Sequence, residues 1–120
     1  MPRKNVLQGA HTVQAQSMGA TFTSPYTNIQ FLDNLMIQIS YTGTPVGTFA
    51  IEGSNDYNPN INPDASHWAN LPLSGTPTAA GSADTIDIQM TQLACSYIRV
   101  VYTRTSGAGV CDMYITGKEI

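Results

Sequence analysis

Turn-forming residues interrupt the chain at short intervals, which leaves room for β-strands but not for long helices, because Gly and Pro end or kink helices. Between these interruptions apolar and polar residues alternate with a period of two, most clearly over Asn34 to Tyr41. This alternation places every second side chain on one buried face of a strand. The sequence therefore predicts an all-β fold, a single antiparallel β-sandwich of the jelly-roll type.

Two pairs of neighbouring strands are expected to form hairpins. The first pair is Asn34–Tyr41 and Val46–Gly53, joined through Thr42 to Pro45; the second is Ser96–Thr105 and Val110–Lys118, joined through Ser106 to Gly109. The glycines of the second connection can supply the positive φ that a tight turn requires. In this second hairpin two inward sets should face each other: Ile98, Val100 and Tyr102 on one strand, and Cys111, Met113 and Ile115 on the other.

Shorter strands are predicted around these pairs, a half-buried one at Ile86 to Met90 and polar, alternating ones at Thr12 to Met18, Thr21 to Thr23 and Asn28 to Leu32. The core should then consist of the inward apolar side chains together with the only tryptophan. Its predicted members are Ile29, Phe31, Leu35, Ile37, Ile39, Phe49, Ile51, Trp68, Leu71, Ile86, Ile88, Ile98, Val100, Met113 and Ile115.

The length of 120 residues fits one domain. We expect a polar N-terminal arm over residues 1–18 and the sandwich over residues 19–120. The first residues lack the apolar stretch of a secretory signal, and no apolar run reaches the length of about 18 residues that a membrane span requires. The sequence therefore predicts synthesis in a cytoplasm and no membrane partner.

Charge is scarce in this chain. Five Lys or Arg and eight Asp or Glu give a net charge of -3, whereas Thr, Ser, Asn and Gln supply 38 of the 120 residues. Binding to nucleic-acid backbones requires clustered basic residues, so we expect no nucleic-acid partner. Cys95 and Cys111 lie in apolar segments without the paired spacing of a zinc site, and we expect both to be small buried side chains.

The sequence contains no arrangement of residues that indicates catalysis. Acid-base chemistry needs two carboxylates, or a carboxylate and a His, in one cleft. Here the eight acidic residues are scattered, and neither His11 nor His67 lies in a known motif. Phosphate-binding loops, nucleophile elbows and HExxH motifs are also missing from the sequence. We therefore expect no enzymatic activity, no cofactor and no metal.

One segment, Asn55 to Asp64, is rich in side-chain oxygens. Its first residues resemble an EF-hand loop, but Ile61 stands where Gly is required and His67 where the bidentate Glu belongs. A series of Asx-Pro turns is therefore favoured over an irregular cation site. A tryptophan among strands is more commonly a core residue, but an exposed one can stack on a sugar ring. The candidate ligand-binding residues are Asn55, Asp56, Tyr57, His67 and Trp68.

The segment GTFAIEGSNDYNPNINPDASHWANL resembles the strand and turn pattern of discoidin-type domains, the C-terminal domains of coagulation factors 5 and 8. The chain end SYIRVVYTRTSGAGVCDMYITGKEI is similar to the closing pair of strands of that family. This resemblance implies a jelly-roll-like sandwich that binds glycans or lipid head groups through loops at one end. It carries no individual ligand residue over to this chain.

The same strand, turn and Trp pattern, together with low charge and Thr-, Asn- and Gln-rich strands, resembles small virion proteins of tailed bacteriophages. This resemblance implies a non-enzymatic structural protein in the virion, made in the host cytoplasm. Its expected role is that of a capsid decoration or cement subunit, which binds itself as a homo-oligomer and other virion proteins such as the shell. The alternative is a carbohydrate- or receptor-binding module of a phage tail or fibre.

The N-terminal arm is the predicted docking element of such a subunit. Its alternating residues, among them Val6, Leu7 and Val13, could add a strand to the sheet edge of a partner.

Overall fold

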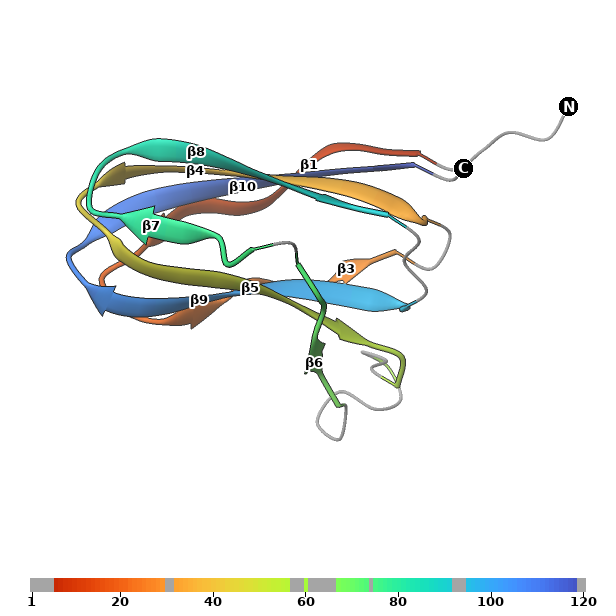
Figure 1. Ribbon diagram of the computed structural model, residues 1–120. Helices are drawn as coiled ribbons and strands as arrows, with labels where there is room; N and C mark the ends of the chain where they lie inside the picture. The colour runs from red at the N-terminus through yellow and green to blue at the C-terminus, as the bar shows by residue number, and fades with distance from the viewer. Residues whose placement is uncertain are drawn as a thin grey trace, which may run out of the picture.

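A computed structural model describes residues 6–29, 32–56, 60, 67–73, 75–91 and 95–118 of the chain. These residues form two antiparallel sheets that pack face to face, seen as two layers in Figure 1. The predicted all-β sandwich is confirmed. No described segment forms a helix capable of crossing a membrane.

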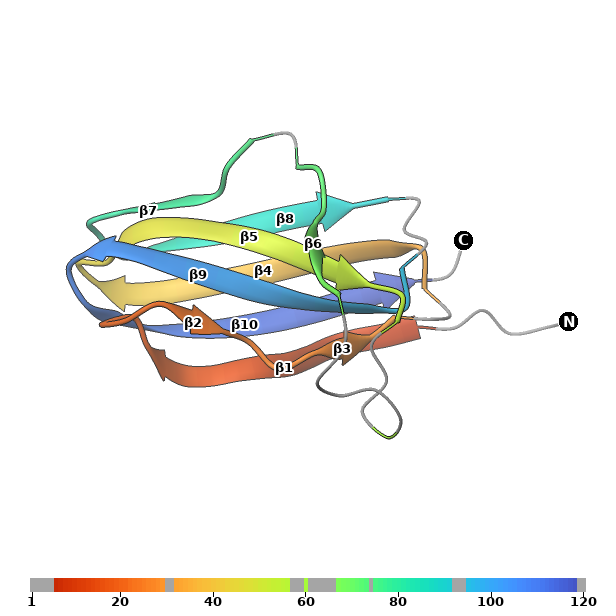
Figure 2. The same cartoon turned by 90° about the horizontal axis from the view of Figure 1, so that it is seen from below.

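The four-stranded sheet has the order β1 (Val6–Ser17), β10 (Gly109–Lys118), β4 (Asn34–Gly43) and β8 (Asp84–Met90). The second sheet has six strands, with β9 (Tyr97–Ser106) and β5 (Val46–Ser54) at its centre. Along β9 lie β2 (Phe22–Thr23) and β3 (Thr27–Asn28), and along β5 lie β6 (Ala69–Asn70) and β7 (Thr78–Ala80), as Figure 2 shows.

Both predicted hairpins are wrong, although their four strands are present. β4 pairs with β10 and β8, whereas β5 pairs with β9, so the two strands of each predicted hairpin lie in opposite sheets. The inward residues of β9 and β10 therefore face each other across the core and not within one sheet. Gly- and Pro-rich connections indicate that the chain reverses. They do not indicate whether the next strand pairs with the first or crosses the sandwich.

The two connections that cross between the sheets, residues 44–45 and 107–108, pack directly against each other. The backbone N–H of Thr44 donates a hydrogen bond to the carbonyl of Ala108 at 2.9 Å. Gly107 has a φ of 71°, which residues with a Cβ rarely adopt. A Cβ at Gly107 would collide with the carbonyl oxygen of Thr44, and one at Gly109 with that of Thr42. Glycine at these positions therefore allows the two backbones to come together.

Inward side chains from both sheets fill the core. The rings of Phe49 and Tyr102, from neighbouring strands, lie 5.0 Å apart between centroids, and Tyr41 of the opposite sheet lies 6.2 Å from Phe49. Such tilted aromatic pairs contribute beyond their buried area. The buried core cluster is Val13, Met18, Ile29, Leu35, Ile37, Ile39, Tyr41, Phe49, Ile51, Ala79, Ile88, Met90, Ile98, Val100, Tyr102, Cys111, Met113 and Ile115.

Most of the predicted core is confirmed, with one important correction. Trp68 is only half-buried and does not belong to the core cluster. Leu71 and Ile86 are partly buried against the cluster, and Phe31 lies outside the described residues. Of the two thiols expected to be buried, Cys111 is buried, and Cys95 is half-buried.

The segment predicted as an N-terminal arm forms a strand of the sandwich over the residues that the structure describes. In β1, Val6 pairs with Lys118, Leu7 with Gly117 and Val13 with Met113, all on β10. Val13 is buried in the core. The edge of β1 that faces β10 is therefore occupied, and only the opposite edge could receive a further strand. The proposed docking role of this segment stays a prediction.

Replacing Gly107 with Ala is expected to destabilise the fold by more than about 1 kcal/mol, because the new Cβ meets the Thr44 carbonyl and φ is unfavourable. Gly75→Ala provides the matched control, since a Cβ there meets nothing within 4 Å. Its free energy of unfolding should change by less than about 0.5 kcal/mol. Urea unfolding of the two variants checks this, and equal stabilities would contradict the packing of the crossing connections.

Candidate functional site

Charged and aromatic side chains gather on the outer face of the six-stranded sheet. Glu52 of β5 and Arg99 of β9 occupy directly opposite, outward positions in the two central strands. The Arg99 Nε lies 2.7 Å from the Glu52 carboxylate, and the two side chains are 30% and 21% exposed. Partial burial and direct strand pairing hold this ion pair in one geometry, in contrast to a mobile surface pair.

Trp68 lies against this ion pair. The guanidinium carbon of Arg99 is 4.2 Å from the centroid of the Trp68 ring, a cation–π contact. The indole is held beside Arg99 because β6 begins at the next residue, Ala69, and its Asn70 pairs with Glu52 of β5. The backbone N–H of Leu71 also donates a hydrogen bond to the carbonyl of Ile51 at 2.8 Å. The tryptophan is therefore fixed on the outer face, away from the core between the sheets.

Two tyrosines extend the surface along β9. Tyr97 lies two positions before Arg99 and so points to the same face, about 7 Å further along the strand. It is 7% exposed yet outside the core cluster. Tyr26 packs edge-on against it with the ring centroids 5.5 Å apart, and remains 43% exposed. We call Tyr26, Tyr97, Arg99, Glu52 and Trp68 the aromatic strip.

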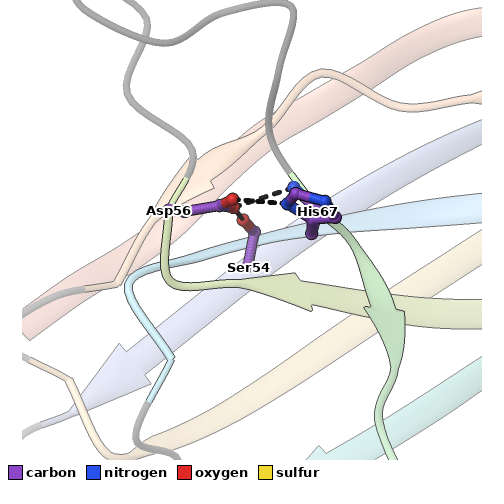
Figure 3. A network of polar contacts seen from close by, with 3 residues as sticks. All are labelled: Ser54, Asp56 and His67. Carbon is purple, nitrogen blue, oxygen red and sulfur yellow. Dashed lines mark hydrogen bonds and ion pairs between the residues drawn. The ribbon is translucent and has the colours of Figure 1, made fainter.

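A polar network joins Ser54 and Asp56, at the end of β5, to His67, just before β6 (Figure 3). It lies beside the aromatic strip, because Ser54 pairs with Tyr97. The Asp56 carboxylate accepts hydrogen bonds from the Ser54 hydroxyl at 2.9 Å and from the backbone N–H of His67 at 2.8 Å. Nδ1 of His67 lies 2.7 Å from the other carboxylate oxygen. An ionised carboxylate only accepts hydrogen bonds, so Nδ1 carries the proton of this contact.

These contacts keep the Asp56 carboxyl ionised. The hydrogen bond with the His67 ring, followed by that from the His67 backbone, lowers the pKa of Asp56 from 3.8 to about 2. Both Ser54 and His67 are directed at the same carboxylate. In a nucleophilic triad, by contrast, the His lies between the Ser and the Asp and removes the hydroxyl proton. The network therefore joins residues 54–56 to residue 67 and is not arranged to activate Ser54.

The structure brings together three of the five residues predicted for ligand binding: Asp56, His67 and Trp68. Asn55 is exposed beside Asp56, and Tyr57 lies outside the described residues. Most of the oxygen-rich segment is likewise not described, so the choice between Asx-Pro turns and a cation site stays a prediction.

Sequence analysis did not identify four further residues of this surface: Glu52, Arg99, Tyr97 and Tyr26. In the sequence, the only indication of this surface is that Glu52 and Arg99 carry opposite charges at outward strand positions. This indicates an ion pair only once the pairing of β5 with β9 is known.

Metal and thiol chemistry receive no support from the described part of the chain. In these ranges no three His, Cys, Asp or Glu side chains are grouped so that they could hold a metal ion. Burial raises the pKa of the Cys111 thiol to about 11, so this group stays protonated at neutral pH.

No protein-family model and no curated protein sequence matches this chain. Among solved structures, the chain is similar to the CBM22-1–GH10 modules of the N-terminal endo-1,4-beta-D-xylanase 10B from Clostridium thermocellum, solved in complex with xylohexaose. The two sequences are 14% identical, and the structures superpose with a TM-score of 0.44. The match covers 93% of this chain and 25% of that chain. The cleaved adhesin domain of Lys-gingipain from Porphyromonas gingivalis is 10% identical, with a TM-score of 0.41 over 83% of this chain and 63% of that one.

The chain thus spans a quarter of the first of these proteins and less than two thirds of the second. At this level of similarity neither protein assigns a function to this chain.

A carboxyl titration followed by carbon-detected NMR should give Asp56 a pKa of about 2. The hydrogen-bonded loop base should be complete above pH 3.8, the ordinary pKa, and be lost as the pH falls through about 2. His67→Ala should move the pKa of Asp56 part of the way back, since the backbone hydrogen bond of residue 67 remains. Ser54→Ala should move it less, because that hydrogen bond is the weaker cause. A wild-type carboxyl titrating at its ordinary pKa would contradict the described network.

Proposed function

We propose that this chain is a non-enzymatic binding module that recognises a neutral carbohydrate through the aromatic strip. The observation that carries the proposal is the position of Trp68, the only tryptophan, which lies half-buried on an outer sheet face. Aromatic rings offer flat apolar faces to a ligand, and their polar ends remain solvated. Exposed Tyr26 adds a second ring to the same face.

The charges around the rings favour a neutral ligand rich in hydroxyl groups. The charge of Glu52 is cancelled by Arg99. Asp56 stays ionised, but its two carboxylate oxygens already accept hydrogen bonds from His67 and Ser54. Both groups are therefore held in place as fixed hydrogen-bonding groups beside the rings. A charged ligand that displaced Arg99 from Glu52 would leave one of these two charges without its partner, which costs free energy. A sugar can use the remaining hydrogen-bonding capacity without doing so.

The absence of catalysis is part of the proposal, and the geometry of the polar network supports it. Ser54 donates its hydroxyl proton to Asp56, the same carboxylate that the His67 ring contacts. Glu52 is engaged with Arg99 at 2.7 Å. In the described part of the chain each of these two carboxylates is therefore held by a donor in a fixed contact, which supports a binding role over acid-base hydrolysis.

A virion structural subunit is the second candidate function, supported by the phage-like sequence pattern and by one structural feature. The outer face of the four-stranded sheet is broad and carries mostly uncharged polar side chains, with exposed Val110 and Tyr114 among them. A surface of this kind suits contacts with other protein subunits. In this role the chain would be made in a host cytoplasm and act in the virion, against copies of itself and a capsid shell.

The carbohydrate proposal is tested with a microarray of neutral glycans, followed by calorimetric titration of the strongest binder. Trp68→Ala should weaken binding by at least about 30-fold, as expected for a central aromatic contact. The variant should still unfold cooperatively, because Trp68 lies outside the core cluster. Tyr26→Ala should weaken binding by about fivefold to tenfold.

Tyr114→Ala is the matched control, because Tyr114 is 37% exposed, similar to Tyr26, but lies on the opposite sheet. Its affinity for the glycan should stay within about twofold of the wild type. The proposal fails if the wild type binds no neutral glycan, or if folded Trp68→Ala binds as well as the wild type does.

A further inference from the structure

The outer face of the four-stranded sheet has a defined pattern along its strands. The outward residues of β10 are Val110, Asp112, Tyr114, Thr116 and Lys118. Tyr114 stands in the middle row with Gln38 of β4 and Asp87 of β8. Because side chains alternate along a strand, all of these side chains lie on the outer face.

A hollow lies at each end of this face. The first, of about 400 Å³, has Met36, Thr116 and Lys118 in its lining. The second, of about 470 Å³, includes Asp84, Val110 and Asp112. The middle row with Tyr114 separates the two, so the face consists of a ridge between two hollows.

The two hollows carry opposite charges. Lys118 is the only Lys or Arg among the described residues of this sheet, and it lines the first hollow. Asp112, an outward residue of β10, lines the second. Asp84 lies in the same lining, but it pairs with the inward Tyr41, so strand alternation directs it to the other side of the sheet. A face that is positive at one end and negative at the other is complementary to a copy of itself turned end over end.

We propose that this face binds a second copy of the chain in a two-fold symmetric dimer. The axis runs parallel to the sheets and perpendicular to the strands, at the level of Ile115. It places β10 of one copy over β10 of the other with the strands antiparallel. Lys118 then faces Asp112 of the second copy, and this ion pair occurs twice because the interface is symmetric.

The same rotation also gives the residues in the middle of the face partners on the second copy. Tyr114 comes to lie over Thr116 of the second copy, at the rim of the first hollow, which can receive its ring. Asp87 comes to face Gln89 of the second copy, whose amide can donate a hydrogen bond. No two acidic residues of the described face are brought opposite each other, so this arrangement avoids repulsion between like charges.

The area of the face is compatible with a weak dimer. Four strands at a spacing of about 4.8 Å and about eight residues at roughly 3.4 Å each give roughly 500 Å² per copy. The total of about 1,000 Å² is at the lower limit for a specific interface, and a dissociation constant of about 1 to 100 μM is expected. This inference is independent of carbohydrate binding, which is proposed for the opposite sheet.

Sedimentation equilibrium of the full chain, up to about 1 mM protein and at low salt, tests the dimer. The wild type should dimerise. Lys118→Glu and Asp112→Lys should each weaken self-association by at least about tenfold, because each places like charges together twice. An equimolar mixture of these two variants should recover dimerisation, since both ion pairs are then restored in the heterodimer.

Asp112 also accepts a hydrogen bond from the backbone of Ala15 at 3.0 Å, so its replacement could disturb β1. If Asp112→Lys does not fold, the dimer is tested with Lys118→Glu and Tyr114→Ala, and both variants should dimerise more weakly than the wild type. Arg104→Glu changes the charge by the same amount as Lys118→Glu at an exposed position of the other sheet. It also removes a hydrogen bond from the Arg104 side chain to the Gly107 carbonyl, so cooperative unfolding of this variant is checked first. The folded variant should dimerise as the wild type does. A wild type that stays monomeric throughout overturns the proposal. The proposal also fails if the wild type dimerises but Lys118→Glu and Tyr114→Ala dimerise equally well.

Discussion

The close contact between the two connections that cross the sandwich, residues 44–45 and 107–108, is the constraint on which the rest of the structure depends. Because the Thr44 backbone bonds to that of Ala108 and Gly107 leaves no side chain between them, β4 and β10 enter one sheet while β5 and β9 enter the other. Further backbone hydrogen bonds tie the neighbouring connections to the same end, from Met18 to Gly109 and from Gly81 to Pro45. The pairing of the long strands follows from these contacts, and with it the separation of inward apolar from outward polar side chains.

This topology gives the molecule two different outer faces. On the six-stranded sheet, pairing of β5 with β9 brings Glu52 beside Arg99, and the return through β6 lays Trp68 on that pair. On the four-stranded sheet, pairing of β10 with β4 and β8 produces a surface with a ridge and two hollows of opposite charge. A carbohydrate site on one face and a self-association site on the other could operate together, since a dimer would present two copies of the aromatic strip.

The sequence predicts strands and their inward faces well, because alternation such as that of Leu35, Ile37 and Ile39 follows directly from the geometry of a strand. It does not predict which strands pair, because the turn residues near Pro45 and Gly107 fit a hairpin and a crossing equally. The misplacement of Trp68 has the same origin: composition favours the core for a single tryptophan, whereas β6 and Arg99 hold it outside. For the candidate site, Asp56, His67 and Trp68 lie in one segment of the sequence, so the sequence alone could group them. The contribution of Arg99, 31 residues further along, required the register of β5 and β9.

Backbone NOEs on isotopically labelled protein test the crossing topology most directly, because they report which strands are neighbours within a sheet. The structure predicts NOEs between Met113 and Ile39, and between Tyr102 and Phe49, whose residues pair in register. A hairpin of β9 and β10 closed by the glycines between them would instead give backbone NOEs between Tyr102 and Met113. Observation of the first set would support the sandwich and the separation of its two faces, and observation of the hairpin NOEs would contradict them.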